Sequence, residues 1–400
     1  MASHLLQRVE TQLVRQEWAE RVVSPAYDSL RPHQRYELME KDPYVFLHVT
    51  RSFGDDRRQV TPEEVSASNA RALSRLLTAG VYEEVRGPSL YLYQLRSGKH
   101  EQTAIIGDIP LSAVKEGNII PHERTRPNRS LYLADHLDKI GVHSSPVALG
   151  YEDDTDVTSV ITAIQGRTQP LLDFHREDQI TQKIWSVADE DAEALLDLMS
   201  DKRAYVVDGH HRVSAAAELW GRNGESEKYG QLFAALFPLS ELRISAFHRR
   251  VTDMSGHTLE ALYQEIAAQD FSILPFDGAD DPKPKQCGEF SMYVNQEWTS
   301  LKPSRMHPSE IDSGILQRKI LEPVFGLDEV QSDSRLQYLP GNAGLSRLVE
   351  QTDQEGGVAF ALHPVPMAQL LSVADRGLTF PPKSTYFEPK VRSGIFLVHR

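Results

Sequence analysis

The stretch from Arg203 to Trp220, RAYVVDGHHRVSAAAELW, constrains the fold of this chain more than any other. The apolar residues 204–207 predict a short buried strand, and the small and apolar residues that follow His210 predict a helix. Asp208 and Gly209 stand between them, and glycine permits a tight turn with close backbone approach. The sequence therefore predicts a strand, a turn and a helix start, a geometry that can bind an anion.

The first turn of this predicted helix carries three cationic or nearly cationic side chains, His210, His211 and Arg212. Unpaired N–H groups and the macrodipole already place positive charge at a helix N-terminus, so cations are disfavoured there unless an anion is bound. A phosphate group at this turn accounts for the pattern. Asp208 is then placed to bind a magnesium ion or accept a proton. The alternative interpretation makes Asp208 an N-cap and leaves the histidines on a solvated surface.

The composition excludes several classes of protein. The 400 residues are 40% hydrophobic and 25% charged, which is typical of a globular chain of roughly two or three domains. No run of about 18 apolar residues predicts a membrane span, and the N-terminus lacks the apolar segment of a secretory signal. The single cysteine, Cys287, cannot form an internal disulfide, so a cytoplasmic location is expected. A net charge of −14 opposes binding to nucleic acid.

Strand-like and helix-like segments alternate loosely, which predicts an α+β (mixed α/β) fold. Helices are expected over about 1–20, 32–41, 62–79, 131–140, 156–165, 189–200, 210–220 and 257–268. Strands are expected at 22–23, 44–49, 147–151, 180–187, 204–207 and twice within 233–251, with a hairpin around Ser97-Gly98. We expect three parts: an N-terminal α/β segment (1–85), a core (86–255) and a C-terminal α/β domain (256–400) that contributes a loop to the site.

A second charged motif, PHERTRP, occupies residues 121–127. Prolines at both ends favour a short extended loop. Within this loop Glu123 is a candidate proton acceptor, and Arg126 is a candidate bidentate partner for a phosphate or a carboxylate. Thr125 is a further candidate for phosphate binding. The same residues also fit a solvated turn with surface ion pairs.

A third motif, PPKSTYFEPK, occupies residues 381–390. Its Lys383, Ser384 and Thr385 have the composition of a phosphate-binding cluster, although no glycine-rich phosphate-binding loop precedes them. A charged turn before a terminal strand is the alternative. The adjacent His210 and His211 would point about 100° apart on a helix, so they cannot bind one metal ion together, and a structural zinc is not expected.

Five segments together resemble a known family: VVSPAYDSL, KDPYVFLHV, IIPHERTRP, YVVDGHHRVSAA and PPKSTYFEPK. They occur in the order found in the uncharacterised family known as domain of unknown function 1015, from about residue 22 to the C-terminus. The DGHHR segment is similar in turn to the phosphate-binding motif of the ParB/sulfiredoxin-like superfamily. That superfamily includes free-serine kinases, sulfiredoxins and the CTP-binding ParB proteins.

The resemblance implies a ParB/sulfiredoxin-like nucleotide-binding core with additional N-terminal and C-terminal α/β elements. It implies Mg²⁺ and a nucleotide, ATP or ADP with CTP as an alternative, bound at the start of the 210–220 helix. The turn contains no cysteine, which excludes sulfiredoxin chemistry, and the negative charge disfavours DNA partitioning. We therefore expect a small-molecule kinase that phosphorylates a hydroxyl of a free, serine-like amino acid or a related metabolite. A nucleotide-binding switch with at most slow hydrolysis and a phosphometabolite hydrolase are the alternatives.

The resemblance also implies roles for individual residues. Glu123, Asp208 and His210 are the expected catalytic residues, with Asp208 also binding the nucleotide-borne Mg²⁺. The expected phosphate-binding or nucleotide-binding residues are Gly209, His210, His211, Arg212, Thr125, Arg126, Lys383, Ser384 and Thr385, and Arg126 is also the candidate for the substrate carboxylate. Glu123 and Asp208 should then face one cavity, with their carboxylates roughly 5–10 Å apart. The expected partners are a nucleotide and a small-molecule substrate, with a homodimer as the candidate assembly and neither nucleic acid nor membrane involved.

Overall fold

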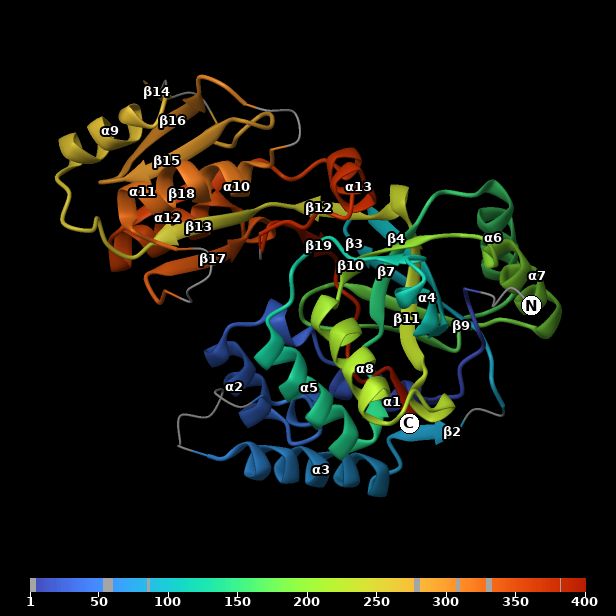
Figure 1. Ribbon diagram of the computed structural model, residues 1–400. Helices are drawn as coiled ribbons and strands as arrows, with labels where there is room; N and C mark the ends of the chain where they lie inside the picture. The colour runs from blue at the N-terminus through green and yellow to red at the C-terminus, as the bar shows by residue number, and fades with distance from the viewer. Residues whose placement is uncertain are drawn as a thin grey trace. The chain divides into compact units, whose positions relative to one another are not determined.

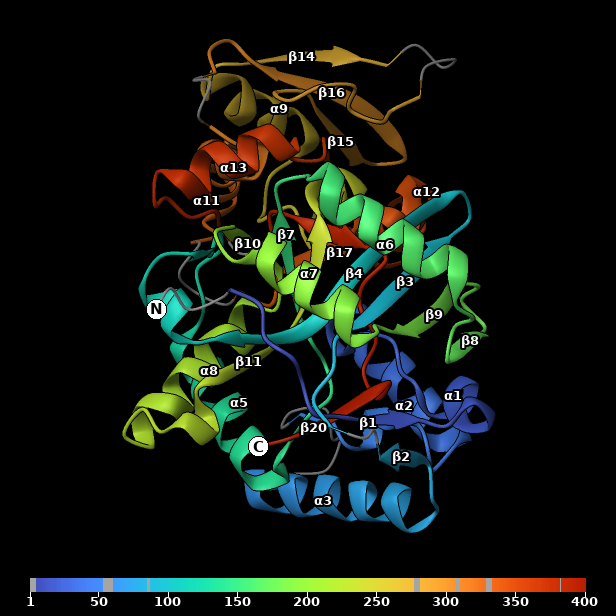
Figure 2. The ribbon, with the colours of Figure 1, turned by 90° about the vertical axis from the view of Figure 1, so that its right-hand side faces the viewer.

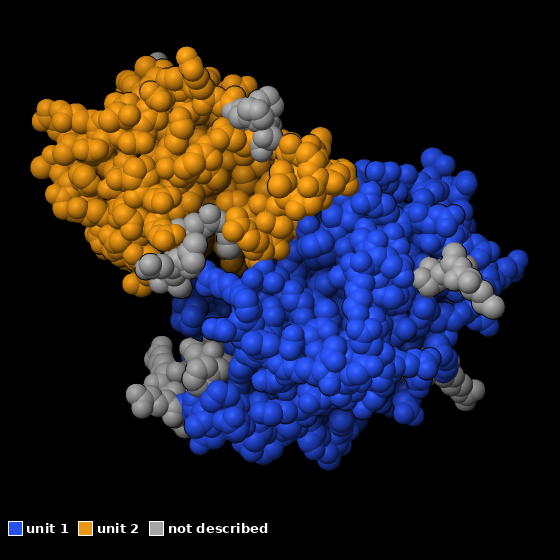
Figure 3. Space-filling model, in the orientation of Figure 1, with its two compact units in different colours: residues 1–121, 125–242, 389–400 blue, residues 122–124, 243–388 orange. Residues whose placement is uncertain are grey.

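Helices and strands alternate along the whole chain in the computed structural model of this protein (Figure 1), so the α+β fold class is confirmed. The structure describes residues 5–52, 60–84, 87–276, 281–306, 310–328, 333–381 and 383–400. These residues form two compact units, coloured blue and orange in Figure 3. Unit 1 contains residues 1–121, 125–242 and 389–400, and unit 2 contains residues 122–124 and 243–388. The division into three parts at residues 85 and 255 stays a prediction.

Unit 1 contains most of the strands and helices of the chain. Its strands are β1 (Gln12–Val14), β2 (Tyr82–Glu84), β3 (Tyr91–Ser97), β4 (His100–Pro110), β5 (Ile119–Ile120), β6 (Val142–His143), β7 (Val147–Tyr151), β8 (Leu172–His175), β9 (Thr181–Ser186), β10 (Ala204–Asp208), β11 (Gln231–Pro238) and β20 (Phe396–His399). Its helices are α1 (Gln16–Val22), α2 (Pro32–Lys41), α3 (Pro62–Thr78), α4 (Ser112–Lys115), α5 (Pro127–Ile140), α6 (Thr155–Arg167), α7 (Asp189–Met199) and α8 (His210–Arg222).

An eight-stranded mixed sheet, in the order β5-β10-β7-β11-β4-β3-β9-β8, forms the centre of unit 1. Strand β10 runs parallel to β5 and antiparallel to β7, and its register against β7 shifts between Val206 and Asp208. One face of the sheet packs against the apolar sides of α6, α7 and α8; Figure 2 shows α6 and α7 along the sheet. The register shift is of the kind that a β-bulge produces, and a bulge bends a strand and redirects its side chains. The shift lies immediately before the junction between β10 and α8.

The C-terminal strand β20 covers the other face of this sheet. The ring of Phe396 lies 5.8 Å from that of Tyr91, 6.2 Å from that of Tyr93 and 5.7 Å from that of Phe233. Strand β20 also joins a small sheet in the order β2-β1-β20-β6. These contacts fix the C-terminal segment on unit 1, which brings residues 389–400 close to elements far earlier in the sequence.

Unit 2 is built on a six-stranded antiparallel sheet, in the order β14-β16-β15-β18-β13-β17. Its strands are β12 (Arg243–Ser245), β13 (Phe247–Val251), β14 (Phe271–Pro275), β15 (Phe290–Val294), β16 (Glu297–Pro303), β17 (Leu336–Pro340), β18 (Val358–Leu362) and β19 (Tyr386–Glu388). Its helices are α9 (Leu259–Ala268), α10 (Asp312–Leu316), α11 (Glu322–Phe325), α12 (Gly344–Glu355) and α13 (Met367–Asp375). One face of the sheet packs on α9, α10 and α11, and the other face packs on α12.

Several expected elements form as predicted because their signals are local. Helix α2 occupies residues 32–41, and α3 follows a capping box at its start. In that box the N–H of Glu64 donates to Oγ1 of Thr61 at 3.2 Å, and the N–H of Thr61 donates to Oε2 of Glu64 at 2.7 Å. The hairpin of β3 and β4 turns at Ser97-Gly98, as expected.

The expected helix over residues 1–20 is wrong for much of that range. Residues 12–14 form β1, which pairs with β2 and β20, and a helix begins only at Gln16. That helix, α1, continues through Val22, where a strand end was expected. The partners of β1 lie about 70 and 385 residues away in the sequence, so no local pattern reveals them.

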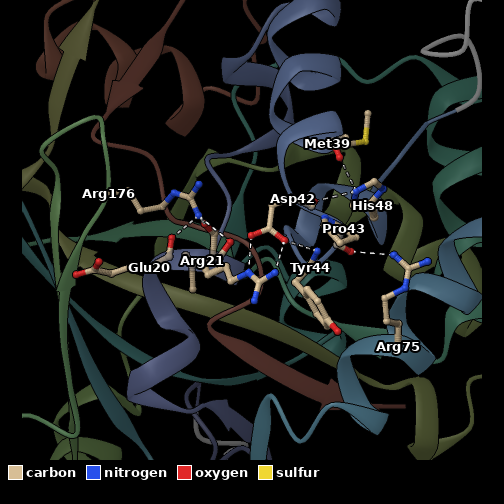
Figure 4. A network of polar contacts seen from close by, with 10 residues as sticks. Glu20, Arg21, Met39, Asp42, Pro43, Tyr44, His48, Arg75 and Arg176 are labelled. Carbon is tan, nitrogen blue, oxygen red and sulfur yellow. Dashed lines mark hydrogen bonds and ion pairs between the residues drawn. The ribbon is translucent and has the colours of Figure 1, made fainter.

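The expected strand over residues 44–49 is also wrong, because this segment folds as a short 3-10 turn at Phe46–His48. Figure 4 shows the polar contacts responsible. Nε2 of His48 lies 3.1 Å from the carbonyl oxygen of Met39 and 3.2 Å from that of Asp42. Arg21 binds the Asp42 carboxylate through Nε at 2.5 Å, and the N–H of Tyr44 donates to the same carboxylate at 2.8 Å. These bonds hold the apolar residues in a turn at the end of α2.

No helix in the parts of the chain that the structure describes is long and apolar enough to cross a membrane.

Candidate functional site

The predicted strand–turn–helix is present at the end of β10. Gly209 is the N-cap of α8, with φ 101° and ψ 25°, in the left-handed region that favours glycine. A Cβ atom at this position would lie 2.8 Å from Nε of Arg212. Glycine is therefore needed both for the backbone conformation and for the approach of the guanidinium. Asp208 is not the N-cap, so the alternative interpretation of that residue is wrong.

The carboxylate of Asp208 is bound by two cations. Its Oδ2 accepts a hydrogen bond from Nη2 of Arg212 at 2.5 Å, and its Oδ1 is paired with Nζ of Lys390. The side chains are largely buried, with exposed fractions of 17% for Asp208 and 8% for Lys390. Each carboxylate oxygen keeps a further lone pair beside these contacts, so the expected role of Asp208 as a Mg²⁺ ligand stays a prediction.

No group of three or more His, Cys, Asp or Glu side chains among the described residues is arranged to hold a metal ion.

Arg212 connects the start of α8 to the segment before β7. Its Nη1 donates to the carbonyl oxygen of Ser145 at 3.0 Å and also to that of Pro146. Together with the ion pair to Asp208, these bonds give the guanidinium a positioning role at the strand–helix junction. Contact of Arg212 with a phosphate group stays a prediction.

Helices α5 and α8 begin next to each other. Nδ1 of His211, in the first turn of α8, lies 3.2 Å from Oγ of Ser130, near the start of α5. Just before α5, Oγ1 of Thr125 accepts a hydrogen bond from Oγ of Ser214 at 3.2 Å. Further along, one apolar cluster joins both helices through Ala134, Leu133, Leu137, Ala215 and Leu219. The two helices therefore run side by side in the same direction (Figure 1).

The N-cap residues of these two helices are Arg126 and Gly209, and neither has a side-chain acceptor that could cap the first N–H groups. Each helix start carries partial positive charge from its macrodipole, and here two of them are adjacent. Arg126 is exposed at the start of α5, whereas His210 is buried and His211 is half-buried in the first turn of α8. Adjacent helix N-termini with an exposed arginine form an electropositive region suited to an anion.

The second and third sequence motifs meet inside unit 2. Nε2 of the buried His122 lies 3.1 Å from Oγ1 of Thr385, and the carbonyl oxygen of His122 accepts from the N–H of Phe380 at 2.7 Å. Glu123 pairs with Phe380 as an isolated parallel bridge. Glu123 belongs to unit 2 and Asp208 to unit 1, and their shared cavity stays a prediction.

The three candidates of the third motif, Lys383, Ser384 and Thr385, differ in burial and in charge. Ser384 and Thr385 are buried, and Oγ of Ser384 lies 2.7 Å from Oγ of Ser313 and donates to the carbonyl oxygen of Pro381 at 2.7 Å. Lys383 has a left-handed backbone with φ 61°, and its Nζ lies 5.3 Å from the ring centroid of Phe247. Only Lys383 among the three brings a charge.

The model of the family described as "Protein of unknown function (DUF1015)" matches residues 8–328. The chain belongs to this family. A comparison with curated proteins finds no match.

Among solved structures, this DUF1015 protein is similar to a free serine kinase in complex with AMP, at 12% identity and a TM-score of 0.40, over 74% of this chain and 91% of that chain. It is also similar to a conserved hypothetical protein from Pyrococcus furiosus, at 12% identity and a TM-score of 0.38, over 72% and 95% of the two chains. A third similar structure is SbnI with C-terminal truncation from Staphylococcus aureus, at 14% identity and a TM-score of 0.36, over 71% and 82%. These likenesses are distant and assign no activity to this chain.

The structure of this DUF1015 protein places two cationic residues, Lys390 and Arg249, in buried positions. The sequence had assigned no role to either of them. Lys390 is the last residue of the third motif and pairs with Asp208, which lies 182 residues earlier. Arg249 is buried in β13 of unit 2. The charged motif that ends at Lys390 indicated a possible site in this segment. The sequence FHRRV around Arg249 predicts only a strand.

Proposed function

We propose that this chain binds a nucleotide, ATP or ADP, with its phosphates at the adjacent starts of α5 and α8, and transfers a phosphoryl group to a hydroxyl of a free amino acid or related metabolite. The observation that carries the proposal is the adjacency of two helix N-termini whose N–H groups receive no hydrogen bond from an N-cap side chain. Each N-terminus is equivalent to roughly half a positive charge, so the pair favours a multiply charged anion.

The residues around these helix starts have distinct roles in the proposal. Arg126 is exposed and supplies a guanidinium for a phosphate oxygen. Thr125, held by Ser214, supplies a hydroxyl beside it. Asp208 positions Arg212 and Lys390. Phosphoryl transfer depends mainly on such positioning and on electrostatic stabilisation of the transferring group.

The chemical step needs a proton acceptor for the attacking hydroxyl. Glu123 is the proposed acceptor: as the substrate oxygen attacks the terminal phosphorus of ATP, its proton passes to the Glu123 carboxylate and ADP leaves. A substitution of Glu123 by Gln removes the acceptor while keeping the size of the side chain.

A second candidate function is a nucleotide-binding regulatory module without turnover. It is favoured by the pairing of both Asp208 oxygens with cations, which gives that carboxylate a structural role at the start of α8.

Thermal unfolding of the full chain with ATP, ADP, CTP and GTP, each with and without MgCl₂, tests nucleotide binding. An adenine nucleotide should raise Tm, since a ligand at 100 times its Kd stabilises the native state by about 2.7 kcal/mol. Arg126→Gln should weaken binding about tenfold or more by removing a charge-assisted hydrogen bond. Arg71→Gln, at an exposed arginine of α3 in the same unit, is the matched control and should bind normally.

The absence of any shift at millimolar nucleotide would refute binding. Incubation with ATP and a panel of free amino acids then separates the two candidate functions. A kinase yields a phosphorylated product that Glu123→Gln does not form, although that variant still binds nucleotide. Binding without product across the panel favours the regulatory module.

A further inference from the structure

The contact between Ser130 and His211 joins two helices, α5 and α8, near their starts. Oγ of Ser130 lies 3.2 Å from Nδ1 of His211. Ser130 is the fourth residue of α5 and is only 6% exposed, whereas His211 is the second residue of α8 and is half-buried. A buried hydroxyl group needs an acceptor for its proton, because a buried donor without one costs free energy.

The usual acceptor for a hydroxyl at this place in a helix is not the partner of Ser130. Serine and threonine hydroxyls in helices commonly donate to the carbonyl oxygen four residues earlier. Thr158, the fourth residue of α6, does so, since its Oγ1 donates to the carbonyl oxygen of Asp154 at 2.8 Å. Among the residues that the structure describes, the hydroxyl of Ser130 instead contacts only Nδ1 of His211.

This contact determines which nitrogen of His211 carries the proton. The hydroxyl of Ser130 must donate to Nδ1, because the reverse bond, from an Nδ1–H group to Oγ, would leave the hydroxyl proton without an acceptor. An imidazole whose Nδ1 accepts a hydrogen bond has its proton on Nε2. Nε2 of His211 is therefore a donor, and the ring adds an N–H group to those at the start of α8.

A second hydrogen bond between the same helix starts has a similar effect. Oγ of Ser214, in α8, donates to Oγ1 of Thr125, just before α5, at 3.2 Å. Because Oγ1 of Thr125 accepts this bond, its own proton is available to a further acceptor. The two hydrogen bonds together make donors of Nε2 of His211 and Oγ1 of Thr125, close to two helix starts that also carry donor N–H groups.

We propose that Ser130 is a positioning residue of the phosphate site. It holds the imidazole of His211 with the proton on Nε2, so that this N–H group donates to a phosphate oxygen. The proposal rests on the proposed function, which puts the phosphates of a nucleotide at the starts of α5 and α8. Ionised phosphate oxygens only accept hydrogen bonds, so they suit a place where every group donates. A ring with its proton on Nδ1 would direct a lone pair at the phosphate and repel it.

The position of the proton is tested without nucleotide, by ¹⁵N NMR of the full chain labelled at histidine, at a pH where free imidazole is neutral. His211→Gln assigns the ring resonances. The parent should have the proton of His211 on Nε2 and an Nδ1 resonance typical of a hydrogen-bond acceptor, and Ser130→Ala should shift that resonance. A proton on Nδ1 in the parent overturns the inference, and the parent spectrum decides this even if Ser130→Ala fails to fold.

Thermal unfolding with ATP tests the consequence for binding. Ser130→Ala should weaken ATP binding about three- to tenfold, which is the usual effect of one hydrogen bond. Ser130→Thr keeps the hydroxyl and should bind like the parent. In the His211→Gln background, Ser130→Ala should cause no further loss, because Ser130 acts through the imidazole. Thr158→Ala removes a hydroxyl at the same position of α6 and is the matched control, so it should leave ATP binding unchanged.

Two binding results overturn the inference while the proposed function stands. One is unchanged ATP binding in Ser130→Ala. The other is an equal loss from Ser130→Ala in the parent and in His211→Gln, which would mean that Ser130 acts only through the packing of α5 against α8. A parent chain that binds no nucleotide refutes the proposed function and the role of Ser130 with it, whichever nitrogen of His211 carries the proton.

Discussion

Asp208 ends β10 between two cations, Arg212 from the start of α8 and Lys390 from the C-terminal segment. The sequence placed Asp208 in a motif suited to a magnesium ion, and the structure pairs its two carboxylate oxygens with cations. Its contribution is to hold Lys390 and Arg212 beside the helix start. Its role is therefore set by its partners, one of which is nearly half the chain away.

Substitution of Asp208 by Asn should lower the free energy of unfolding by about 3 kcal/mol, because it removes the carboxylate that pairs with the buried Lys390. Lys390→Met in the same chain should recover part of this loss. Urea unfolding of the two single variants and the double variant measures the coupling between them, which should exceed about 1 kcal/mol. Additive effects of the two substitutions would show that the ion pair contributes little to stability.

Two glycines at the ends of helix α8 have opposite surroundings. Gly209 precedes the helix with a φ of 101° and has Arg212 against it, whereas a Cβ atom added to Gly221, near the end of the helix, would meet no neighbouring atom within 4 Å outside the nearby helix backbone. The first is required by the backbone and by packing. The second only weakens the helix, since glycine is a poor helix former.

Alanine substitutions at these two glycines should have opposite effects on stability. Gly209→Ala should lower the free energy of unfolding by at least about 1 kcal/mol, because alanine is strained at positive φ and its Cβ displaces Arg212. Gly221→Ala should raise it by about 0.5–1 kcal/mol. Chemical denaturation of both variants gives the two values, and a loss of similar size at both positions would contradict the role assigned to Gly209.

The stability of the whole chain should depend on pH through buried groups that the proposed sites do not use. Burial, with the charges of Arg249 and Lys283, lowers the pKa of His248 to about 4. Its Nδ1 accepts a hydrogen bond from the N–H of Leu362 at 3.2 Å, which requires that nitrogen to be unprotonated. Burial raises the pKa of Asp312 to about 6, so its contribution to the pH dependence has the opposite sign.

The unfolded chain protonates His248 near pH 6.5 and the folded chain only near pH 4, so this residue should make stability fall as the pH decreases across that range. Between pH 7.5 and pH 5 the loss should be about 2 kcal/mol. Over the same pH range, the free energy of unfolding of His248→Gln should fall by about 2 kcal/mol less than that of the parent, because all other titrating groups are present in both proteins. Urea unfolding at the two pH values checks it, and equal losses in parent and variant would show that His248 does not titrate differently in the two states.

Much of the candidate site could be predicted from sequence because its signals act over a few residues. The apolar run before Asp208, the glycine that must adopt positive φ and the small residues of α8 each carry their own physical preference. The capping box of α3 and the hairpin turn at Ser97-Gly98 are of the same kind. In each case the conformational preferences of the residues within the element are enough to determine its structure.

The tertiary structure alone decided which charges meet. No local pattern distinguishes Arg249 from Arg250, yet Arg250 pairs with Glu355 of α12, whereas Arg249 donates to the carbonyl oxygen of Phe247 in its own strand. The pairing of Lys390 with Asp208 and the strand formed by residues 12–14 likewise depend on segments far apart in the sequence. The energy of a charge or of an unpaired strand edge is set by what surrounds it, and those surroundings exist only once the chain has folded.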